Sequence, residues 1–189
     1  MKIKGSNVIT LRDFVIDKFG ERGFTRLLQV LPNASKKIFE EDRITNIWYD
    51  FYDAFLTPLE TLCEQFFHDS PQGAFEYGNY SAHHDLRGIY GAFFRLGSPA
   101  WTISKTALIW RLYYSEGTVE VTKKNDHHVT FLFHGLENER ISQPWEQQNA
   151  GWMLGAAEVI GVKNPTIEIT HSQAKGAGKP EFSLSWDPK

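Results

Sequence analysis

The chain has 189 residues, of which 41% are hydrophobic and 14% aromatic, a composition that supports one sizeable core and predicts a single domain over residues 1–189. Its formal net charge is only −3, without a block of five like charges, which excludes the electrostatic pattern of a nucleic-acid-binding protein. The sequence has no secretory signal and no run of about 18 apolar residues. Its lone cysteine excludes an internal disulfide and a multi-cysteine metal site. We therefore expect a cytoplasmic protein without a transmembrane segment.

Residues 1–31 have the spacing of two amphipathic helices. Apolar side chains recur at intervals of three and four at Val8, Leu11, Val15 and Phe19. Gly20 should end this first helix, because a helix end often needs a residue with positive φ. A second helical segment is predicted over 24–31, up to Pro32.

A longer helix is predicted over residues 48–66, where large apolar side chains keep helical spacing. Pro58 lies inside it and should kink or split it, since proline lacks a backbone donor. Cys63 falls on the apolar side, so we expect a buried, unactivated thiol. The stretch DSP at 69–71 is typical of a capped helix start, and a further helix is expected over about 79–96.

After Trp101 the chain becomes rich in β-branched and aromatic residues, which favour strands. The segments TALIWRLYY (106–114), TVEVTKK (118–124) and HVTFLFHG (128–135) predict three consecutive antiparallel strands. Ser115, Glu116 and Gly117 stand between the first two and suit a hairpin turn, because Gly117 can take a positive φ at little cost.

One more helix and two final strands complete the predicted order. Ser142 and Pro144 should open a helix that ends at Gly161. PTIEITHS (165–172) and PEFSLSW (180–186) predict strands around a glycine-bearing turn. The order is an α+β plan with a helical part over 1–100, a mixed β part over 101–189, and helices on one face of the sheet.

Parts of the sequence resemble known families. KGSNVITLRDFVIDKFGERGFTRLL (4–28) resembles the opening of haem nitric-oxide-binding domains, which begin with a helix of the type D-F-V-x-x-K-F-G-E. Four later segments are similar to an uncharacterised bacterial family: GIYGAFFRLGSPAW (88–101), IWRLYYSEGTVEV (109–121), AGWMLGAAEVIGVKN (150–164) and GKPEFSLSW (178–186). That family is similar to 4-vinyl reductase domains and, more distantly, to small subunits of the TRAPP tethering complex. The resemblance implies an N-terminal helical bundle packed on a four- to five-stranded antiparallel sheet, in modules that mostly bind ligands or act as scaffolds.

The haem-binding motif of the first family is incomplete here. Haem nitric-oxide-binding domains hold the haem propionates with Y-x-S-x-R, and the matching positions are Tyr113, Ser115 and Gly117. The resemblance therefore implies a clamp without its arginine, the residue that pairs with both oxygens of a carboxylate. Glu116 would repel a propionate at the same place.

The closing motif of the 4-vinyl-reductase-like domains is also incomplete. It contains two cysteines, and their positions fall on Ser172 and Pro180. Proline has no donor side chain, so the thiol or metal chemistry of those cysteines is not expected in this chain.

Two histidine pairs are candidates for a ligand to metal or haem. His83-His84 lies in a predicted helix, where adjacent side chains point about 100° apart, so at most one of them faces the interior. His127-His128 lies in a polar turn beside Asp126. Solvated or hydrogen-bonded histidines are the preferred interpretation of both pairs, and we predict no metal site.

Aromatic residues are the strongest indication of a site. The sequence has no G-x-S-x-G, H-E-x-x-H, Walker or dinucleotide-binding motif, so we predict no catalytic residue and no enzyme. Where the resembling families form a pocket between helices and sheet, the candidate ligand-binding residues are Tyr90, Phe94, Trp110, Tyr113, Tyr114 and Trp152. Such residues line many ligand sites, but they also fill ordinary cores, which is their more common role.

Three functions remain. The preferred one is a non-enzymatic ligand-binding or sensory domain, with a small hydrophobic ligand in this pocket and a protein partner or homodimer to pass on the signal. The alternative is a dimeric assembly protein of tethering-subunit type, in which side chains fill the pocket. The second alternative is a haem-based gas sensor that uses His83 or His84 with Tyr113 and Ser115, although the missing arginine disfavours haem.

Overall fold

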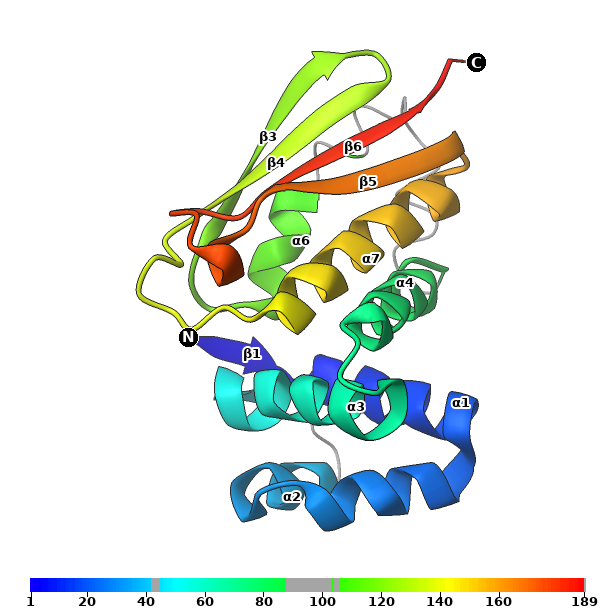
Figure 1. The fold of residues 1–189 in the computed structure, drawn as a ribbon, viewed down its shortest axis with the longest axis vertical. Helices are drawn as coiled ribbons and strands as arrows, with labels where there is room; N and C mark the ends of the chain where they lie inside the picture. Colours follow the sequence, from blue (N-terminus) through cyan, green and yellow to red (C-terminus); the bar gives the residue numbers. More distant parts are fainter. Residues whose placement is uncertain (42–44, 88–102, 104–105, 189) are drawn as a thin grey trace.

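A computed structural model describes residues 1–41, 45–87, 103 and 106–188. Among these residues a four-stranded antiparallel sheet has the strand order β3-β4-β6-β5. Its strands are Thr118–Asn125 (β3), His128–His134 (β4), Lys163–His171 (β5) and Glu181–Asp187 (β6). Each corresponds to a strand predicted from the sequence, and Figure 1 shows the sheet as a layer beside the helices.

The two faces of this sheet differ in polarity. Side chains alternate between the faces of a strand, and the buried residues of the two central strands are Val129, Phe131, Phe133, Phe182, Leu184 and Trp186. Phe131 lies opposite Phe182 in the register of β4 and β6, so large apolar side chains meet across the strands. The inner face therefore needs a cover of helices.

Two helices provide this cover, α6 (Thr106–Tyr113) and α7 (Gln143–Ile160). The ends of α7 agree with the sequence prediction: Ser142 is its N-cap, proline stands in the first turn, and Gly161 follows with φ +82°. Helix α4 (Gln72–Arg87) packs on the side of α7 away from the sheet (Figure 1). The predicted α+β fold is confirmed, and no helix of the described residues is long and apolar enough to cross a bilayer.

Helices α4 and α7 are in backbone contact. A Cβ atom on Gly78 would overlap the carbonyl group of Gln148, and one on Gly151 would overlap the carbonyl group of Phe75. Small residues permit this close approach because they remove the side chains that normally separate helices. The contact fixes α7 from behind and sets which of its side chains point to the sheet.

The N-terminal helix α1 (Gly5–Val30) is kinked at Gly20, where φ is +72°. The predicted end of the first helix is therefore a bend, because only the backbone at Gly20 leaves the helical region and both halves continue. Helix α2 (Asn33–Glu40) follows.

The prediction of a helix beginning at residue 48 is wrong at its start. Strand β2 (Trp48–Asp50) pairs with β1 (Lys2–Lys4), a pairing between distant parts of the chain. A π-helical turn, η1 (Tyr52–Leu56), then leads into α3 (Thr57–Phe67) with helical backbone at the junction. Pro58 stands in the first turn of α3, so the predicted break is a widened turn before the proline and the helix is not split.

The strand predicted over residues 106–114 is also wrong, because this segment forms α6. Its buried positions Ile109, Trp110 and Tyr114 lie on one helical face, whereas Leu108 and Leu112 are exposed. Burial of that face against the sheet overrides the strand preference of its aromatic and β-branched residues.

The linker after α6 is consequently not a hairpin turn. Residues 115–117 connect a helix to β3, although Gly117 does have the expected positive φ of +78°. The helix start predicted at 69–71 and the helix predicted over 79–96 belong to one helix, α4, which begins at Gln72 and is described to Arg87. Residues 88–96 lie outside the described part of the chain.

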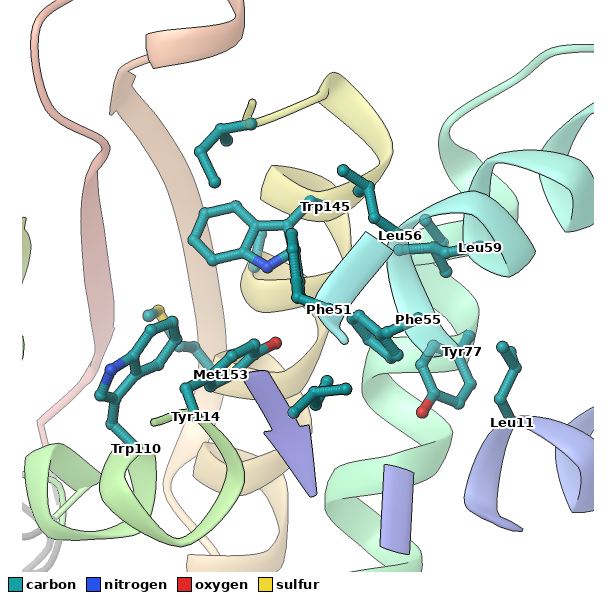
Figure 2. Packing of buried hydrophobic residues seen from close by; sticks show 14 of the residues in the cluster. Leu11, Phe51, Phe55, Leu56, Leu59, Tyr77, Trp110, Tyr114, Trp145 and Met153 are labelled. Atoms are coloured by element: carbon teal, nitrogen blue, oxygen red, sulfur yellow. The ribbon is translucent and has the colours of Figure 1, made fainter. Parts of the chain in front are cut away.

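One apolar cluster joins the helical half to the sheet half. Figure 2 shows Phe55 of the π-turn beside Tyr77 of α4, and the packing continues through Phe51 to Trp110, Tyr114, Trp145 and Met153. Cys63 belongs to this cluster and is buried as predicted. The end of the cluster with Trp110 and Tyr114 borders the sheet, where Trp110 meets Phe133 of β4.

A candidate ligand cavity between α6, α7 and the sheet

A cavity of about 50 Å³ lies between helices α6 and α7 and the inner face of the sheet. Its lining residues are Asn7, Ile109, Trp110, Tyr113, Tyr114, Val119, Phe131, Phe133, Gln148, Asn149, Trp152 and Met153. Most of this surface is aromatic or aliphatic, and three amide side chains supply polar groups. This combination is typical of sites for small molecules.

A stack of rings forms the apolar wall. Trp110 lies flat against Tyr114, with ring centroids 3.9 Å apart and 17° between the planes. Phe133 of β4 meets Trp110 edge-on at 5.1 Å. The indole nitrogen of Trp110 donates a hydrogen bond to the carbonyl oxygen of Glu116 at 3.0 Å. These contacts hold the indole in one orientation, so the wall is formed in advance of any ligand.

Two buried amides of α7 form the polar part of the lining. Gln148 and Asn149 are 5% and 7% exposed. Asn149 donates to the Trp145 carbonyl oxygen at 2.9 Å and to Gln148 Oε1 at 3.1 Å. Buried amide groups need hydrogen-bond partners, and these two provide donors and acceptors without a charge.

Tyr114 adds no charge at neutral pH. Burial raises the pKa of its hydroxyl above the usual value, against a lowering effect of the neighbouring Trp145 and Asn149 side chains. Tyr113 donates its hydroxyl proton to Asp85 Oδ2 at 2.7 Å. The cavity therefore presents aromatic faces and neutral polar groups.

The candidate residues from the sequence fall into two groups. Trp110, Tyr113, Tyr114 and Trp152 all line this one cavity. Tyr90 and Phe94 lie outside the described residues. The structure thus brings together every described member of the predicted pocket.

The histidine candidates lie elsewhere. His83 Nε2 is 2.9 Å from Glu158 Oε2, and His84 Nδ1 is 3.1 Å from Asp85 Oδ1. Neither is among the residues that line the cavity. Both are hydrogen-bonded, as predicted. Within the described part of the chain, no group of three or more histidine, cysteine or acidic residues could hold a metal ion.

The incomplete haem clamp has other roles in this structure. The Ser115 hydroxyl accepts a hydrogen bond from the Lys2 backbone at 2.8 Å, and the Ser115 backbone donates to the Lys2 carbonyl oxygen at 3.0 Å. At Gly117 an added Cβ would come within 2.8 Å of Leu136. The clamp positions thus anchor β1 and close a tight turn.

The residues present do not fit a haem. A cavity of roughly 150 Å³ accommodates one benzene molecule, and the space here is about 50 Å³, too small for a tetrapyrrole. The sequence has no histidine between His84 and His127, and the described residues of the cavity lining include neither histidine nor cysteine.

Sequence reasoning missed the polar part of the site. Asn7, Gln148 and Asn149 were not among the candidates, and neither was Met153. A signal for the α7 residues did exist, because 148 and 149 follow Trp145 by three and four positions and so share its buried face. Polar side chains on an otherwise apolar helix face are informative.

Solved structures with a similar fold are H-NOX proteins. One from S. oneidensis, in the Fe(II)NO ligation state, is 11% identical over 98% of this chain and 99% of that chain, with a TM-score of 0.75. The Fe(II) unliganded H-NOX protein from K. algicida is 14% identical over 98% and 97%, with a TM-score of 0.70. A mutant of T. Tengcongensis H-NOX is 11% identical over 98% of each chain, with a TM-score of 0.67.

These likenesses establish the fold, at identities too low to establish the activity. No protein-family model matches the sequence, and no curated protein matches it. The predicted similarity to the haem nitric-oxide-binding fold is confirmed by the H-NOX structures. The similarity to 4-vinyl reductase domains and TRAPP subunits stays a prediction.

Proposed function

We propose that this chain is a non-enzymatic ligand-binding or sensory domain whose ligand occupies the cavity between α6, α7 and the sheet, and which acts through a protein partner or a homodimer. The observation that carries the proposal is the cavity itself, with the stacked Trp110 and Tyr114 on one side and the buried amides Gln148 and Asn149 on α7. In this proposal the domain has the fold of H-NOX proteins and binds its ligand without a cofactor.

The lining defines the class of ligand. Neutral amides and aromatic faces favour a small, uncharged and mostly apolar molecule with one hydrogen-bonding group. At about 50 Å³ the cavity admits a molecule smaller than benzene without rearrangement. Trp152 is only half-buried at the lining, so a rotation of its side chain would admit a larger ligand.

Helix α6 connects the cavity with the surface. Its inner face carries Ile109 and Trp110, while Leu108 and Leu112 are 62% and 46% exposed. Two exposed leucines one helical turn apart suit contact with a partner. A ligand that shifts α6 would thereby alter the surface offered to that partner.

Native mass spectrometry of protein purified from its own host tests the ligand. We expect the wild-type protein to retain a small molecule. A Val119→Phe variant should not retain it, because the larger side chain on β3 fills the cavity. Val121→Phe is the matched control, because residue 121 lies on the same face of the same strand but outside the cavity lining. Retention by both variants, or by none of the three proteins, would contradict the proposal.

Analytical ultracentrifugation tests the partner surface. If the domain acts through a homodimer, Leu108→Glu with Leu112→Glu should give a monomer, whereas Ile47→Glu at another exposed apolar position should not. A tight dimer without any retained ligand would favour the assembly function instead.

A haem-based gas sensor is the alternative raised by the H-NOX structures, one of which was solved in the Fe(II)NO state, but the cavity and its described lining do not fit haem. Titration with haem should give no stoichiometric Soret band. Such a band with an axial-histidine signature that disappears in His83→Ala or His84→Ala would replace the proposed function with this one.

A further inference from the structure

We propose a second binding site, for a small organic amine with an apolar body, in the groove between α7, β5 and the turn that follows β5. The groove has a volume of about 500 Å³, within the usual range of small-molecule sites. Its lining residues are Phe75, Gln143, Glu146, Gln147, Ala150, Ile167, Ile169, Thr170, His171, Ser172, Lys175 and Ala177. None of them lines the aromatic cavity, so this site is independent of the proposed function.

Glu146 is the central residue of the groove. It lies in the first turn of α7 and is only 1% exposed. Its Oε2 accepts a hydrogen bond from the Ser172 hydroxyl at 2.6 Å, and its Oε1 accepts one from the Ala174 backbone at 3.2 Å. A carboxylate has about four acceptor sites, so about half of its capacity remains for a further donor.

The negative charge of Glu146 has no cationic partner among the described residues. The positive end of the α7 dipole and the two hydrogen bonds stabilise the carboxylate. A buried charge is nevertheless costly unless it is paired. A cationic donor in the groove would complete this pairing.

An apolar strip continues from the carboxylate. Ala150 follows Glu146 by one helical turn on the same side of α7, and Ile167 and Ile169 lie opposite on the inner face of β5. Phe75 of α4 also lines the groove. An ammonium group at Glu146 thus leaves the remainder of the ligand on aliphatic and aromatic surface.

The other charged or titratable groups of the groove are at its rim. Lys175 and His171 are both exposed, so water and salt screen their effect on a cation at Glu146. The strand β5 is at one edge of the sheet in the described chain. The buried carboxylate of Glu146 is therefore the charge that decides the preference of the groove, for a monovalent amine over an anion.

Calorimetric titration with phenethylamine tests the proposal, with 2-phenylethanol and 3-phenylpropionate as the neutral and anionic analogues. We expect the amine alone to bind, with one site per chain. Glu146→Gln should weaken binding by about tenfold or more, because one partner of a buried charge pair is lost. Glu168→Gln is the matched control, an exposed carboxylate of β5 outside the groove, and should bind as wild type does.

A second variant separates binding from folding. Ile167→Thr keeps the charge and the strand preference but removes part of the apolar strip, so it should weaken phenethylamine binding. Because Ile167 also packs against the core, circular dichroism should show that the variant is folded at the temperature of the titration. Amide chemical shifts should change at Ile167 and Ile169, and the indole signals of Trp110 and Trp152 should not move. Equal binding of amine and alcohol, full binding by Glu146→Gln, absence of binding, or shifts confined to the indoles would each overturn the proposal.

Discussion

The indole of Trp110 lies on the phenol ring of Tyr114 at a centroid distance of 3.9 Å. The two residues are four positions apart in one helical segment. Their rings point from this segment toward Phe133 of the sheet and Trp145 of α7. Trp145 meets both rings edge-on, at 6.1 Å from Trp110 and 6.5 Å from Tyr114. The wall of the cavity is thus also part of the core.

Removal of the Trp110 ring should therefore destabilise the protein. Trp110 is 6% exposed, so Trp110→Ala is expected to lower the free energy of unfolding by about 3–5 kcal/mol, as for other buried aromatic residues. Urea denaturation measures the change. Trp48→Ala is the control, because Trp48 is 38% exposed and its removal should cost below about 1 kcal/mol.

Replacement of Gly78 or Gly151, at the contact of α4 and α7, by alanine should lower the stability of the protein, although alanine has the higher helix propensity. Alanine improves an exposed helix by about 1 kcal/mol relative to glycine, but at Gly78 or Gly151 its Cβ would overlap backbone atoms of the other helix. We expect each variant to lose about 1–3 kcal/mol of stability, as in other overpacked interiors. Gly178→Ala, where the Cβ would meet no atom within 4 Å, should change the unfolding midpoint little, and similar midpoints in all three would contradict the close contact.

Restoration of the missing arginine should not create a haem site. Gly117 has a φ of +78° and lies against Leu136, so Gly117→Arg is expected to cost about 1–2 kcal/mol from the backbone conformation alone. Haem titration followed by absorbance should show no Soret band in this variant. Thr118→Arg adds the same side chain at the exposed neighbouring position and should keep wild-type stability; a stoichiometric band in Gly117→Arg alone would show that the clamp is functional.

The buried thiol should be unreactive and should make stability depend on alkaline pH. Burial raises the pKa of Cys63 to about 11. The unfolded thiol has a pKa near 8.5, so the unfolded state loses this proton first as the pH rises. The free energy of unfolding therefore decreases between about pH 8.5 and 11, by no more than about 1.4 kcal/mol per pH unit.

Comparison of wild type with Cys63→Ala isolates this effect. The stability difference between the two proteins should be constant below pH 8 and should shrink as the pH increases from 8.5 to 10. Thiol-reactive reagents should label the folded wild type only at the rate of its unfolding. A constant difference together with rapid labelling would show that the thiol is accessible.

Local patterns predicted much of the fold. Strands β4 and β6 have alternating apolar residues, and α7 has a capped start and a glycine at its end, so the residues themselves indicate both elements. Helix α6 was predicted as a strand because its aromatic and β-branched composition favours strands, while its burial against the sheet is a tertiary effect. The pairing of β1 with β2 joins residues such as Ile3 and Tyr49, which no local pattern connects.

The candidate site could be predicted in part for the same reason. Trp110, Tyr113, Tyr114 and Trp152 could be proposed because aromatic residues are conspicuous in sequence. Asn7 could not, since it reaches the cavity only through the position of α1 in the folded chain. The groove at Glu146 depends on the contact of α7 with residues 172–174, which is equally distant in sequence.

Helix α7 has almost no side that faces water: of its 18 residues, only Gln143 and Glu158 are exposed. It contacts α4 through glycine, borders the aromatic cavity through its amides, and holds Glu146 in the groove. In a saturation-mutagenesis library selected for folded protein, substitutions in α7 should therefore be depleted at nearly every position, whereas the partly exposed α1 should tolerate changes with a period of 3 to 4 residues. Residues of α7 should therefore change in evolution mainly together with the residues that they contact, and seldom alone.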